Sequence, residues 1–428
     1  MLRAALYNYR WEISIAVLAL ATHLFVFFLL VNAQNGDVLA TVRVDDGFYE
    51  LAENIRAGNG FSWNTEAPYL PNTMRTPGYS VLLAGLIEIF GVTGAAIVQL
   101  LAATAIPLLG LSIARVLTRS RTVGIIIGIV LALDPTLAQL SFQFYTETVF
   151  LIVFFAWLLT ILHYFKRPTV TILILSALFL GAAILIKASV QYIPLLLIPF
   201  ILWVHGKKNW RQSVAHIGIL LIIVGAILAP WILRNVQQFD TPALSTQASF
   251  VLYTNFAPAV LSIAEDRSFS EVIDTFLTPE EYRGDAITFA NEGAYKEKAL
   301  TIMREHPEAT AFVMGKSLFT FFTNDGFYTL LSRSGQNPDN YLAALIMMRL
   351  VWIGITLSAL IGACAYLLTK RSPSTIFVII LVGYFALIST TAAFGTNPRY
   401  RLPVDPIIIS LAVVGASLIL AKFKREKY

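Results

Sequence analysis

The sequence predicts an all-α polytopic membrane protein with about ten transmembrane helices and further helices at the extracytoplasmic membrane interface. The first observation behind this fold class is composition: 57% of the 428 residues are hydrophobic and 13% are charged, whereas soluble domains carry roughly 25% charged residues. The second is a series of long apolar runs, since about 20 apolar residues cross a bilayer as a helix. The third is an alternation of charge between the connectors that join these runs.

Ten apolar runs are predicted to span the membrane. The first ends in Val31-Asn32-Ala33, which is similar to a signal-peptide cleavage site, but the run is long for a cleaved segment and we interpret it as a retained helix. The sixth is short and contains Pro194 and Pro199, so its limits are the least defined. The predicted spans are residues 13–31, 94–117, 123–140, 149–165, 170–186, 192–204, 214–233, 342–368, 376–391 and 404–420.

Alternate connectors differ in charge. One set, which includes both ends of the chain, holds 16 of the 31 Lys and Arg residues but two of the 26 Asp and Glu residues, so the rest of the chain holds 15 and 24. Short connectors rich in Lys and Arg stay in the cytoplasm. We therefore expect a multi-pass protein of the plasma membrane with both termini cytoplasmic. The basic residues of this set are Arg3, Arg10, Arg115, Arg119, Arg121, Lys166, Arg167, Lys207, Lys208, Arg211, Lys370, Arg371, Lys422, Lys424, Arg425 and Lys427.

The chain is predicted to form one transmembrane domain over residues 1–428. Two long segments, residues 32–93 and 235–341, are expected on the extracytoplasmic side. Within them, the apolar stretches 79–90 and 310–322 are too short or too interrupted to span a bilayer, so we expect helices that rest at the interface. The single cysteine, Cys364, rules out a disulfide framework. The sequence also contains neither a P-loop nor a convincing dinucleotide fingerprint, which argues against a nucleotide-driven pump.

Two adjacent carboxylates, Asp45 and Asp46, follow the first apolar run at the mouth of the predicted membrane domain. A short helical pattern comes next, with Tyr49, Ala52 and Ile55 on one face. An acid at a membrane–water boundary is a candidate functional residue. The alternative is an ordinary acidic first turn of a short helix.

Further charged residues lie at or near the predicted outer ends of the spans. Each cation alone is explained by a side chain that extends to the lipid headgroups. This explanation is less convincing for the charged residues taken together, because an unpaired charge inside a bilayer costs roughly 2.5–3.5 kcal/mol. A ligand with an apolar tail, a phosphate and a neutral head group would match them, as in a polyprenyl-phosphate sugar. These residues are Asp134, Glu147, Lys187, Arg234, Arg349, Arg399 and Arg401.

Several stretches, in this order and spacing, resemble the GT-C glycosyltransferases, most closely the protein O-mannosyltransferase and aminoarabinose-transferase-like branch. Asp45 and Asp46, followed by Tyr49, Ala52 and residues 58–61 (Gly-Asn-Gly-Phe), are similar to the first outside loop of that group. The resemblance extends from about residue 44 to 406. Its other stretches are residues 75–79 (Arg-Thr-Pro-Gly-Tyr), 145–150 (Tyr-Thr-Glu-Thr-Val-Phe), 228–235 (Leu-Ala-Pro-Trp-Ile-Leu-Arg-Asn) and 394–403, which contains Arg-Tyr-Arg-Leu-Pro.

The resemblance implies a GT-C fold and an inverting transfer of a sugar from a polyprenyl-phosphate-linked donor. Asp45 matches the acid taken as general base, and Asp46 is its partner in the acid pair. Glu147 is expected to orient the acceptor or, with Asp46, to help bind a divalent metal; no cofactor is firmly implied. The residues expected at the donor phosphate are Arg75, Lys187, Arg234, Arg349, Arg399, Tyr400 and Arg401.

The resemblance leaves the sugar and the acceptor open, because the segment after the last predicted span is short and adds no outside domain. A lipid, a glycan and a protein are all candidate acceptors. The expected partners are these substrates and membrane lipids, with no nucleic acid. Two other functions stay open from the residues themselves: a flippase or transporter of a polyprenyl-linked glycan, and a non-catalytic paralogue. A transporter favours related halves and broken helices at the midplane, and the sequence shows no such halves.

Overall fold

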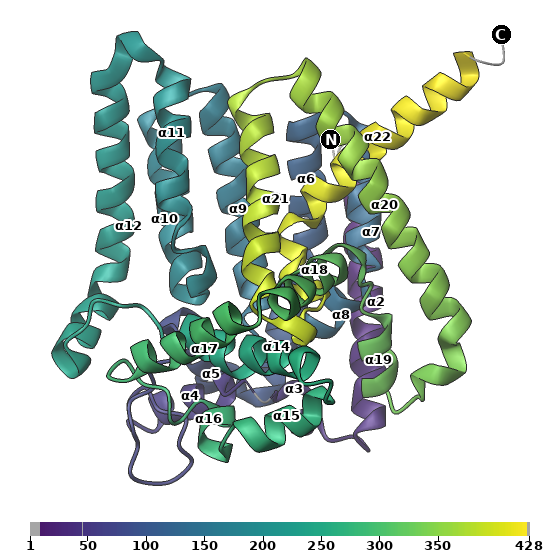
Figure 1. Ribbon diagram of the computed structural model, residues 1–428. Coiled ribbons are helices and arrows are strands. Elements are labelled where there is room, and N and C mark those ends of the chain that lie inside the picture. The colour runs from purple at the N-terminus through teal and green to yellow at the C-terminus, as the bar shows by residue number, and fades with distance from the viewer. Residues whose placement is uncertain (1–8, 45, 426–428) are drawn as a thin grey trace.

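The computed structural model describes residues 9–44 and 46–425, the last three of these by their backbone alone. These residues form helices and no β-strand, which confirms the predicted all-α class. Figure 1 shows long helices packed side by side, with a layer of short helices at one end of the bundle.

The chain passes back and forth along the bundle. α2 (Arg10–Ala33) begins and α22 (Asp405–Arg425) ends at the same end, which we call the terminus end (Figure 1). The short helices that follow α2, and those between α12 (Trp210–Phe239) and α20 (Leu342–Thr369), lie at the opposite end, which we call the loop end. This arrangement matches the predicted placement of the two long connectors at the same end.

Within the described residues, eight helical stretches are long and apolar enough to cross a membrane, and two shorter apolar helices accompany them, α7 (Arg121–Ala132) and α10 (Val170–Ile186). Each of the ten predicted spans overlaps one of these helices or a pair of them. The other long helices are α5 (Pro77–Ala103), α6 (Ala105–Thr118), α9 (Glu147–Lys166), α11 (Ile193–His205) and α21 (Pro373–Thr390).

The predicted separate helix at residues 79–90 is present. It is the first of the two helices that make up α5, and its position at the membrane interface stays a prediction. The two parts are separated by a kink at Gly91, which has a φ of 69°. Glycine tolerates this backbone conformation because it has no Cβ.

The third predicted span, residues 123–140, is two helices in the structure. α7 ends at Ala132, and α8 (Pro135–Leu140) begins after a break. Asp134 caps α8, since its Oδ1 accepts the backbone N–H of Leu137 at 2.7 Å. Pro135 is tolerated in the first turn of α8 but would interrupt a continuous helix.

Short helices form the layer at the loop end. The stretch at residues 310–322 forms a helix, α18 (Pro307–Thr323), with Phe312 and Phe319 exposed, and its position at the membrane interface stays a prediction. The remaining short helices are α3 (Val38–Val42), α4 (Phe48–Arg56), α13 (Gln247–Val251), η3 (Leu252–Phe256), α14 (Ala257–Ala264), α15 (Phe269–Phe276), α16 (Pro279–Arg283), α17 (Glu292–Glu305), α19 (Phe327–Arg333), η5 (Ala393–Gly395), η6 (Pro398–Tyr400) and η7 (Leu402–Val404).

α9 lies in the core and α20 at the periphery. Phe150, Phe154 and Trp157 of α9 are fully buried. α20 packs closely against α22 where Gly362 and Gly415 meet. The two backbones are so near that a Cβ on either glycine would collide with the other helix. Small residues allow such close crossings. The central position of α9 holds its first residue in place at the loop end.

We expect position 208 to be shielded and position 285 to be accessible from outside the cell. Lys208 lies in η2 (Lys207–Asn209) at the terminus end, and Asp285 follows α16 at the loop end. The charge bias predicts that the terminus end is cytoplasmic. Lys208→Cys and Asp285→Cys, each in a Cys364→Ser background, would be treated with a membrane-impermeant maleimide in intact cells and after permeabilisation. Labelling of position 208 but not position 285 in intact cells would reverse the topology.

Candidate active site

The local backbone fixes the direction of Asp46. Before it, Val44 is buried; after it, Gly47 has a φ of 76° and caps α4. The indole of Trp63 lies so close to Gly47 that a Cβ there would collide with the ring. Asp46 is therefore held in a short, tightly packed connector between α3 and α4. Asp45, the predicted general base, lies outside the described residues.

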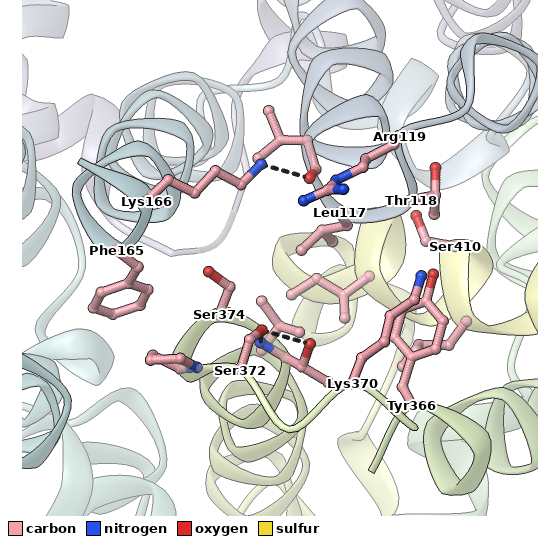
Figure 2. A pocket seen from close by; sticks show the side chains of 16 residues that line it. Leu117, Thr118, Arg119, Phe165, Lys166, Tyr366, Lys370, Ser372, Ser374 and Ser410 are labelled. Carbon is pink, nitrogen blue, oxygen red and sulfur yellow. Dashed lines mark hydrogen bonds between the residues drawn. The ribbon is translucent and has the colours of Figure 1, made fainter. Parts of the chain in front are cut away.

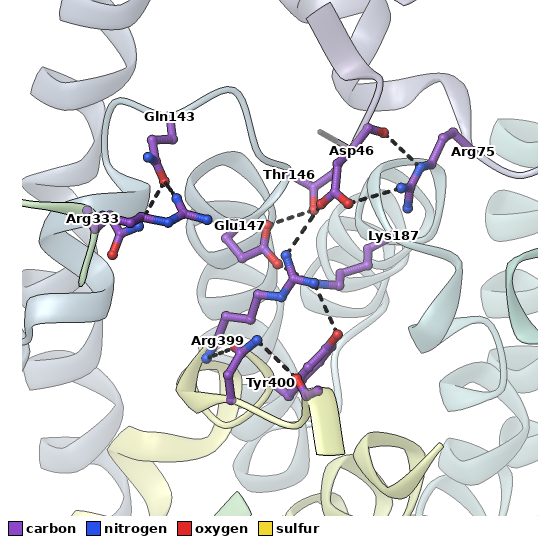
Figure 3. Close-up of polar contacts among 12 residues, drawn as sticks. Asp46, Arg75, Gln143, Thr146, Glu147, Lys187, Arg333, Arg399 and Tyr400 are labelled. Atoms are coloured by element: carbon purple, nitrogen blue, oxygen red, sulfur yellow. Dashed lines mark hydrogen bonds and ion pairs between the residues drawn. The ribbon is translucent and has the colours of Figure 1, made fainter. Parts of the chain in front are cut away.

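The Asp46 carboxylate bridges two arginines from distant parts of the chain (Figure 3). Its Oδ1 lies 3.2 Å from Nη2 of Arg75, and its Oδ2 lies 3.3 Å from Nη1 of Arg399. Nε of Arg75 also donates to the backbone carbonyl of Asp46 at 3.2 Å. Arg75 precedes α5 and Arg399 belongs to η6. Asp46 thus joins the first loop-end connector to the last.

A second carboxylate pairs with a lysine beside this bridge. Nζ of Lys187, just after α10, lies 2.8 Å from Oε1 of Glu147, the first residue of α9. Oε2 of Glu147 accepts a hydrogen bond from the hydroxyl of Thr146 at 3.2 Å. The Glu147 side chain is buried, whereas 22% of the Lys187 side chain is exposed. Lys187 therefore offers its ammonium group to the site from a fixed position.

Aromatic rings and one amide position Arg399. Its guanidinium lies 5.2 Å from the ring centre of Tyr145 and 5.1 Å from that of Tyr400. Nη2 donates to the Tyr400 hydroxyl at 3.1 Å, and Oδ1 of Asn397 accepts the backbone N–H of Arg399 at 3.1 Å. Nε is buried and has no hydrogen-bond partner within the described part of the chain. A buried donor without a partner is uncommon and is available to a ligand.

We call Asp46, Glu147, Arg75, Lys187 and Arg399 the charged cluster. Burial raises the pKa of Asp46, but the charges of Arg75, Arg399 and Lys187 outweigh this effect and hold the pKa below the ordinary value of 3.8. Burial also lowers the pKa of Arg399, but Tyr400, Asp46 and Glu147 raise it well above its ordinary value. Both residues are ionised at neutral pH. Three cations face two carboxylates, so the cluster suits an anionic ligand.

Arg333 joins the same region and was not predicted from the sequence. It ends α19, and its Nη1 donates to Oε1 of Gln143 at 2.9 Å. Arg333, Tyr145 and Arg399 line one cavity of about 270 Å³. Nothing in its neighbours Ser332 and Ser334 distinguishes Arg333 from a surface arginine. Its role depends on the packing of α19 against α8, which local sequence does not reveal.

Arg401, predicted at the donor phosphate, is instead enclosed in the protein interior. Its Nε lies 2.7 Å from Oδ1 of Asp405, and its side chain is fully buried. Nη1 donates to the backbone carbonyls of Phe321 and Asn324 at 2.9 and 2.8 Å. The guanidinium also lies 3.5 Å from the ring centre of Trp352. These contacts connect α18, α20 and α22, so Arg401 has a structural role in this arrangement.

Two other predicted phosphate ligands also lie apart from the charged cluster. The Arg234 guanidinium is surrounded by the rings of Phe61, Trp231 and Phe239, at 5.9, 4.6 and 4.9 Å from their centres. Arg349 lies in α20, where it has no ion-pair partner among the described residues. Of the residues predicted at the donor phosphate, the structure therefore brings four together. They are Arg75, Lys187, Arg399 and Tyr400.

Two cavities meet at Asp46. The larger, about 850 Å³, lies between the first loop-end connector and the segment after α12, and the smaller, about 500 Å³, lies beside the end of α2. Asp46 lines both, and so stands at the boundary between them. The larger is also lined by Arg43, Trp63, Arg75, Asn255, Tyr282 and Asp285, and the smaller by Leu30, Ala33, Gln143, Tyr145 and Arg333.

Comparisons with known proteins agree with this architecture. Residues 74–233, less than half of the chain, match the family described as dolichyl-phosphate-mannose-protein mannosyltransferase. No curated protein matches the chain in sequence. The apo oligosaccharyltransferase of Archaeoglobus fulgidus has a similar structure over 98% of this chain and 52% of its own, with a TM-score of 0.58 and 14% identity.

The oligosaccharyltransferase AglB from Archaeoglobus fulgidus, in complex with an inhibitory peptide and a dolichol-phosphate, matches 99% of this chain and 52% of its own, with a TM-score of 0.52 and 15% identity. The chain has the GT-C membrane glycosyltransferase fold. The predicted resemblance to GT-C proteins is confirmed. The chain spans about half the length of the two archaeal structures. All these comparisons are with glycosyltransferases.

The segment that matches the mannosyltransferase family contains Arg75, Glu147 and Lys187, but neither Asp46 nor Arg399. The family match therefore covers only three of the five residues of the charged cluster in this GT-C protein. The contacts of Asp46 with Arg75 and Arg399 connect the matched segment to the rest.

The sequence allows a divalent metal at Asp46 and Glu147. Among the described residues, no three His, Cys, Asp or Glu side chains come together as metal ligands. Asp46 and Glu147 are each already paired with a cation. Divalent cations such as Mg²⁺ take about six oxygen ligands. The described donor set of this GT-C fold does not fit such a site, and we derive no catalytic step through a metal.

We expect Arg399→Ala to weaken donor binding and Arg401→Ala to lower stability instead. Removing one partner of a buried ion pair costs about 3–5 kcal/mol, so Arg401→Ala should lower the melting temperature and the yield. Arg399→Lys should bind donor with intermediate affinity, because an ammonium lacks the planar fork of a guanidinium. The measurements are thermal unfolding, and binding of a polyprenyl-phosphate sugar per folded molecule. Normal stability with lost binding in Arg401→Ala would contradict the assignment.

Proposed function

We propose that the protein is an inverting glycosyltransferase that moves a sugar from a polyprenyl-phosphate-linked donor to an acceptor at the loop end, on the extracytoplasmic face of the plasma membrane. One observation carries this proposal: Asp46 lies where two cavities meet, next to cations that suit a phosphate. A transferase needs its donor and its acceptor to meet at one point. A transporter needs a path across the bilayer instead.

The smaller cavity suits the donor. It lies beside Leu30 and Ala33 at the end of α2, which is also where a lipid tail would reach the protein from the membrane. Arg333 lies on this side, with Tyr145 between it and Arg399. Arginine side chains offer several fixed N–H donors to the oxygens of a phosphate. We therefore place the donor phosphate between Arg333 and Arg399.

The larger cavity suits the acceptor. Most of its lining residues are polar or aromatic, and they come from both long connectors. The indole Nε1 of Trp63 donates to Oδ1 of Asp285 at 2.9 Å, which ties the two connectors together at the cavity. A hydroxyl group carried by a lipid, a glycan or a protein would approach Asp46 from this side.

The transfer then follows from the two bound substrates. The acceptor oxygen attacks C1 of the sugar from the face opposite the phosphate, while the bond between C1 and the phosphate oxygen breaks. The acceptor proton passes to a carboxylate, and the polyprenyl phosphate leaves with the electron pair. Attack from the opposite face inverts the configuration at C1. Arg399 and Lys187 stabilise the leaving phosphate as an anion, so it needs no proton.

We assign the base to Asp45 and a positioning role to Asp46. A carboxylate whose pKa is held low by three cations is a weak proton acceptor, and Asp46 is such a group. Its contacts instead fix Arg75 and Arg399. Glu147 acts in the same way on Lys187, since it is buried and paired with that lysine.

We expect Asp45→Asn to abolish transfer while the folded protein still binds donor. General-base catalysis is worth about 10²–10⁴-fold, so turnover should fall by that factor or below detection. Asp46→Asn should reduce both turnover and donor affinity, because it leaves Arg399 without its ion-pair partner. The measurements are turnover per folded molecule and donor binding.

Asp37→Asn is the matched control. Asp37 lies in the same connector, is exposed and caps α3 through its Oδ1. A cap contributes about 1 kcal/mol to stability, so this variant should keep its turnover per folded molecule. Normal turnover in Asp45→Asn, Asp46→Asn and the double variant would remove both acids from the mechanism.

A further inference from the structure

A separate basic pocket, drawn in Figure 2, lies at the terminus end and shares no residue with the charged cluster. It has a volume of about 380 Å³ and lies among the ends of α6 and α9, the α20–α21 connector and α22. Arg119, Lys166 and Lys370 line it, at the C-terminal ends of α6, α9 and α20. No Asp or Glu belongs to its described lining.

These cations keep donors available for a ligand. Nζ of Lys166 donates to the backbone carbonyl of Val116 at 2.9 Å, which leaves two of its three N–H groups. Nζ of Lys370 lies 4.6 Å from the ring centre of Tyr366. Arg119, which follows the last residue of α6, has no ion-pair partner in the described part of the chain. Figure 2 shows Lys166 and Arg119 on one side of the pocket and Lys370 on the other.

Hydroxyl groups and a helix terminus add to the positive lining. Ser372 caps α21, since its Oγ accepts the backbone N–H of Thr375 at 3.2 Å. α21 therefore begins at the pocket, and the N-terminus of a helix favours an anion. The hydroxyls of Thr118, Ser374 and Ser410 also line it, while Phe165, Val378, Ile407 and Leu411 supply apolar walls.

Basic residues at this end also have a simpler explanation, because they set the orientation of the chain in the membrane. That explanation requires charge near the membrane and no particular geometry. The charge needed for orientation is also supplied by basic residues that do not line the pocket, such as Arg167, Lys207 and Lys208. The convergence of three cations and six hydroxyl-bearing residues on one cavity needs a further reason.

We propose that this pocket binds a phosphate group with an apolar or glycerol-like attachment. A tetrahedral anion presents oxygens in several directions, which matches donors on opposite walls, whereas a planar carboxylate matches a fork on one side. The apolar walls accommodate the carbon atoms next to the phosphate. The phosphate has two possible sources, an anionic phospholipid of the adjacent leaflet and a soluble phosphate ester.

Nanodiscs separate the two sources. Wild-type protein would be placed in neutral phosphatidylcholine nanodiscs, in nanodiscs containing phosphatidylglycerol, and in neutral nanodiscs with added glycerol 3-phosphate. Binding would be measured by native mass spectrometry and by the shift in melting temperature. The test variant is Arg119→Gln with Lys370→Gln, and the control is Lys207→Gln with Lys208→Gln, which removes the same charge at the same end.

We expect wild type and control to bind one of the two phosphate ligands, and the test variant to bind it at least about tenfold more weakly, since it lacks the hydrogen bonds from two charged groups. Equal melting temperatures in neutral nanodiscs would show that the variant is folded. Binding of phosphatidylglycerol assigns the lipid source, and binding of glycerol 3-phosphate alone assigns the soluble one. Equal binding in wild type and test variant, equal loss in the control, or no binding of either ligand would overturn the proposal.

Discussion

The arrangement of the candidate site depends on one carboxylate that holds two arginines. Asp46 contacts Arg399 across 353 positions of sequence and Arg75 across 29. Without it, two guanidinium groups and Lys187 would face one another with Glu147 as their nearest acid. Charges in a partly buried site interact strongly because water screens them poorly. The ion pairs therefore set the relative positions of the first connector, the start of α5 and the last connector.

The helical bundle provides rigid support for this bridge. Glu147 is the first residue of α9, whose side chains are buried along its length, and Lys187 follows α10, which packs against α9. Arg401 fixes η7 and α22 to the backbone of α18 two residues after Arg399. The residues of the charged cluster thus lie in connectors or at the ends of helices. Buried ion pairs next to them, such as Arg401 with Asp405, restrict how far these segments move. This division is common in enzymes, where a rigid scaffold positions loop residues.

Much of the fold could be read from the sequence, since apolar runs and their caps are local signals. The break between α7 and α8 was also signalled locally, by Asp134 before Pro135. The types of residue in the site were predicted, but their partners were not, because pairing across hundreds of residues leaves no local pattern. Arg401 carried a usable signal that was missed: Asp405 lies four residues later, the spacing of an ion pair on one helical face. Arg333 carried none.

In the proposed complex, a polyprenyl-phosphate sugar binds with its phosphate at Arg399 and its first isoprenoid units beside the end of α2. The most direct test is photo-crosslinking with a donor that carries a diazirine on its first isoprenoid unit, followed by mass spectrometry of the modified peptides. We expect crosslinks within residues 26–46, 139–146 or 329–335, and a loss of these crosslinks in Arg399→Ala. Crosslinks confined to the terminus end, or crosslinks unchanged by Arg399→Ala, would contradict it.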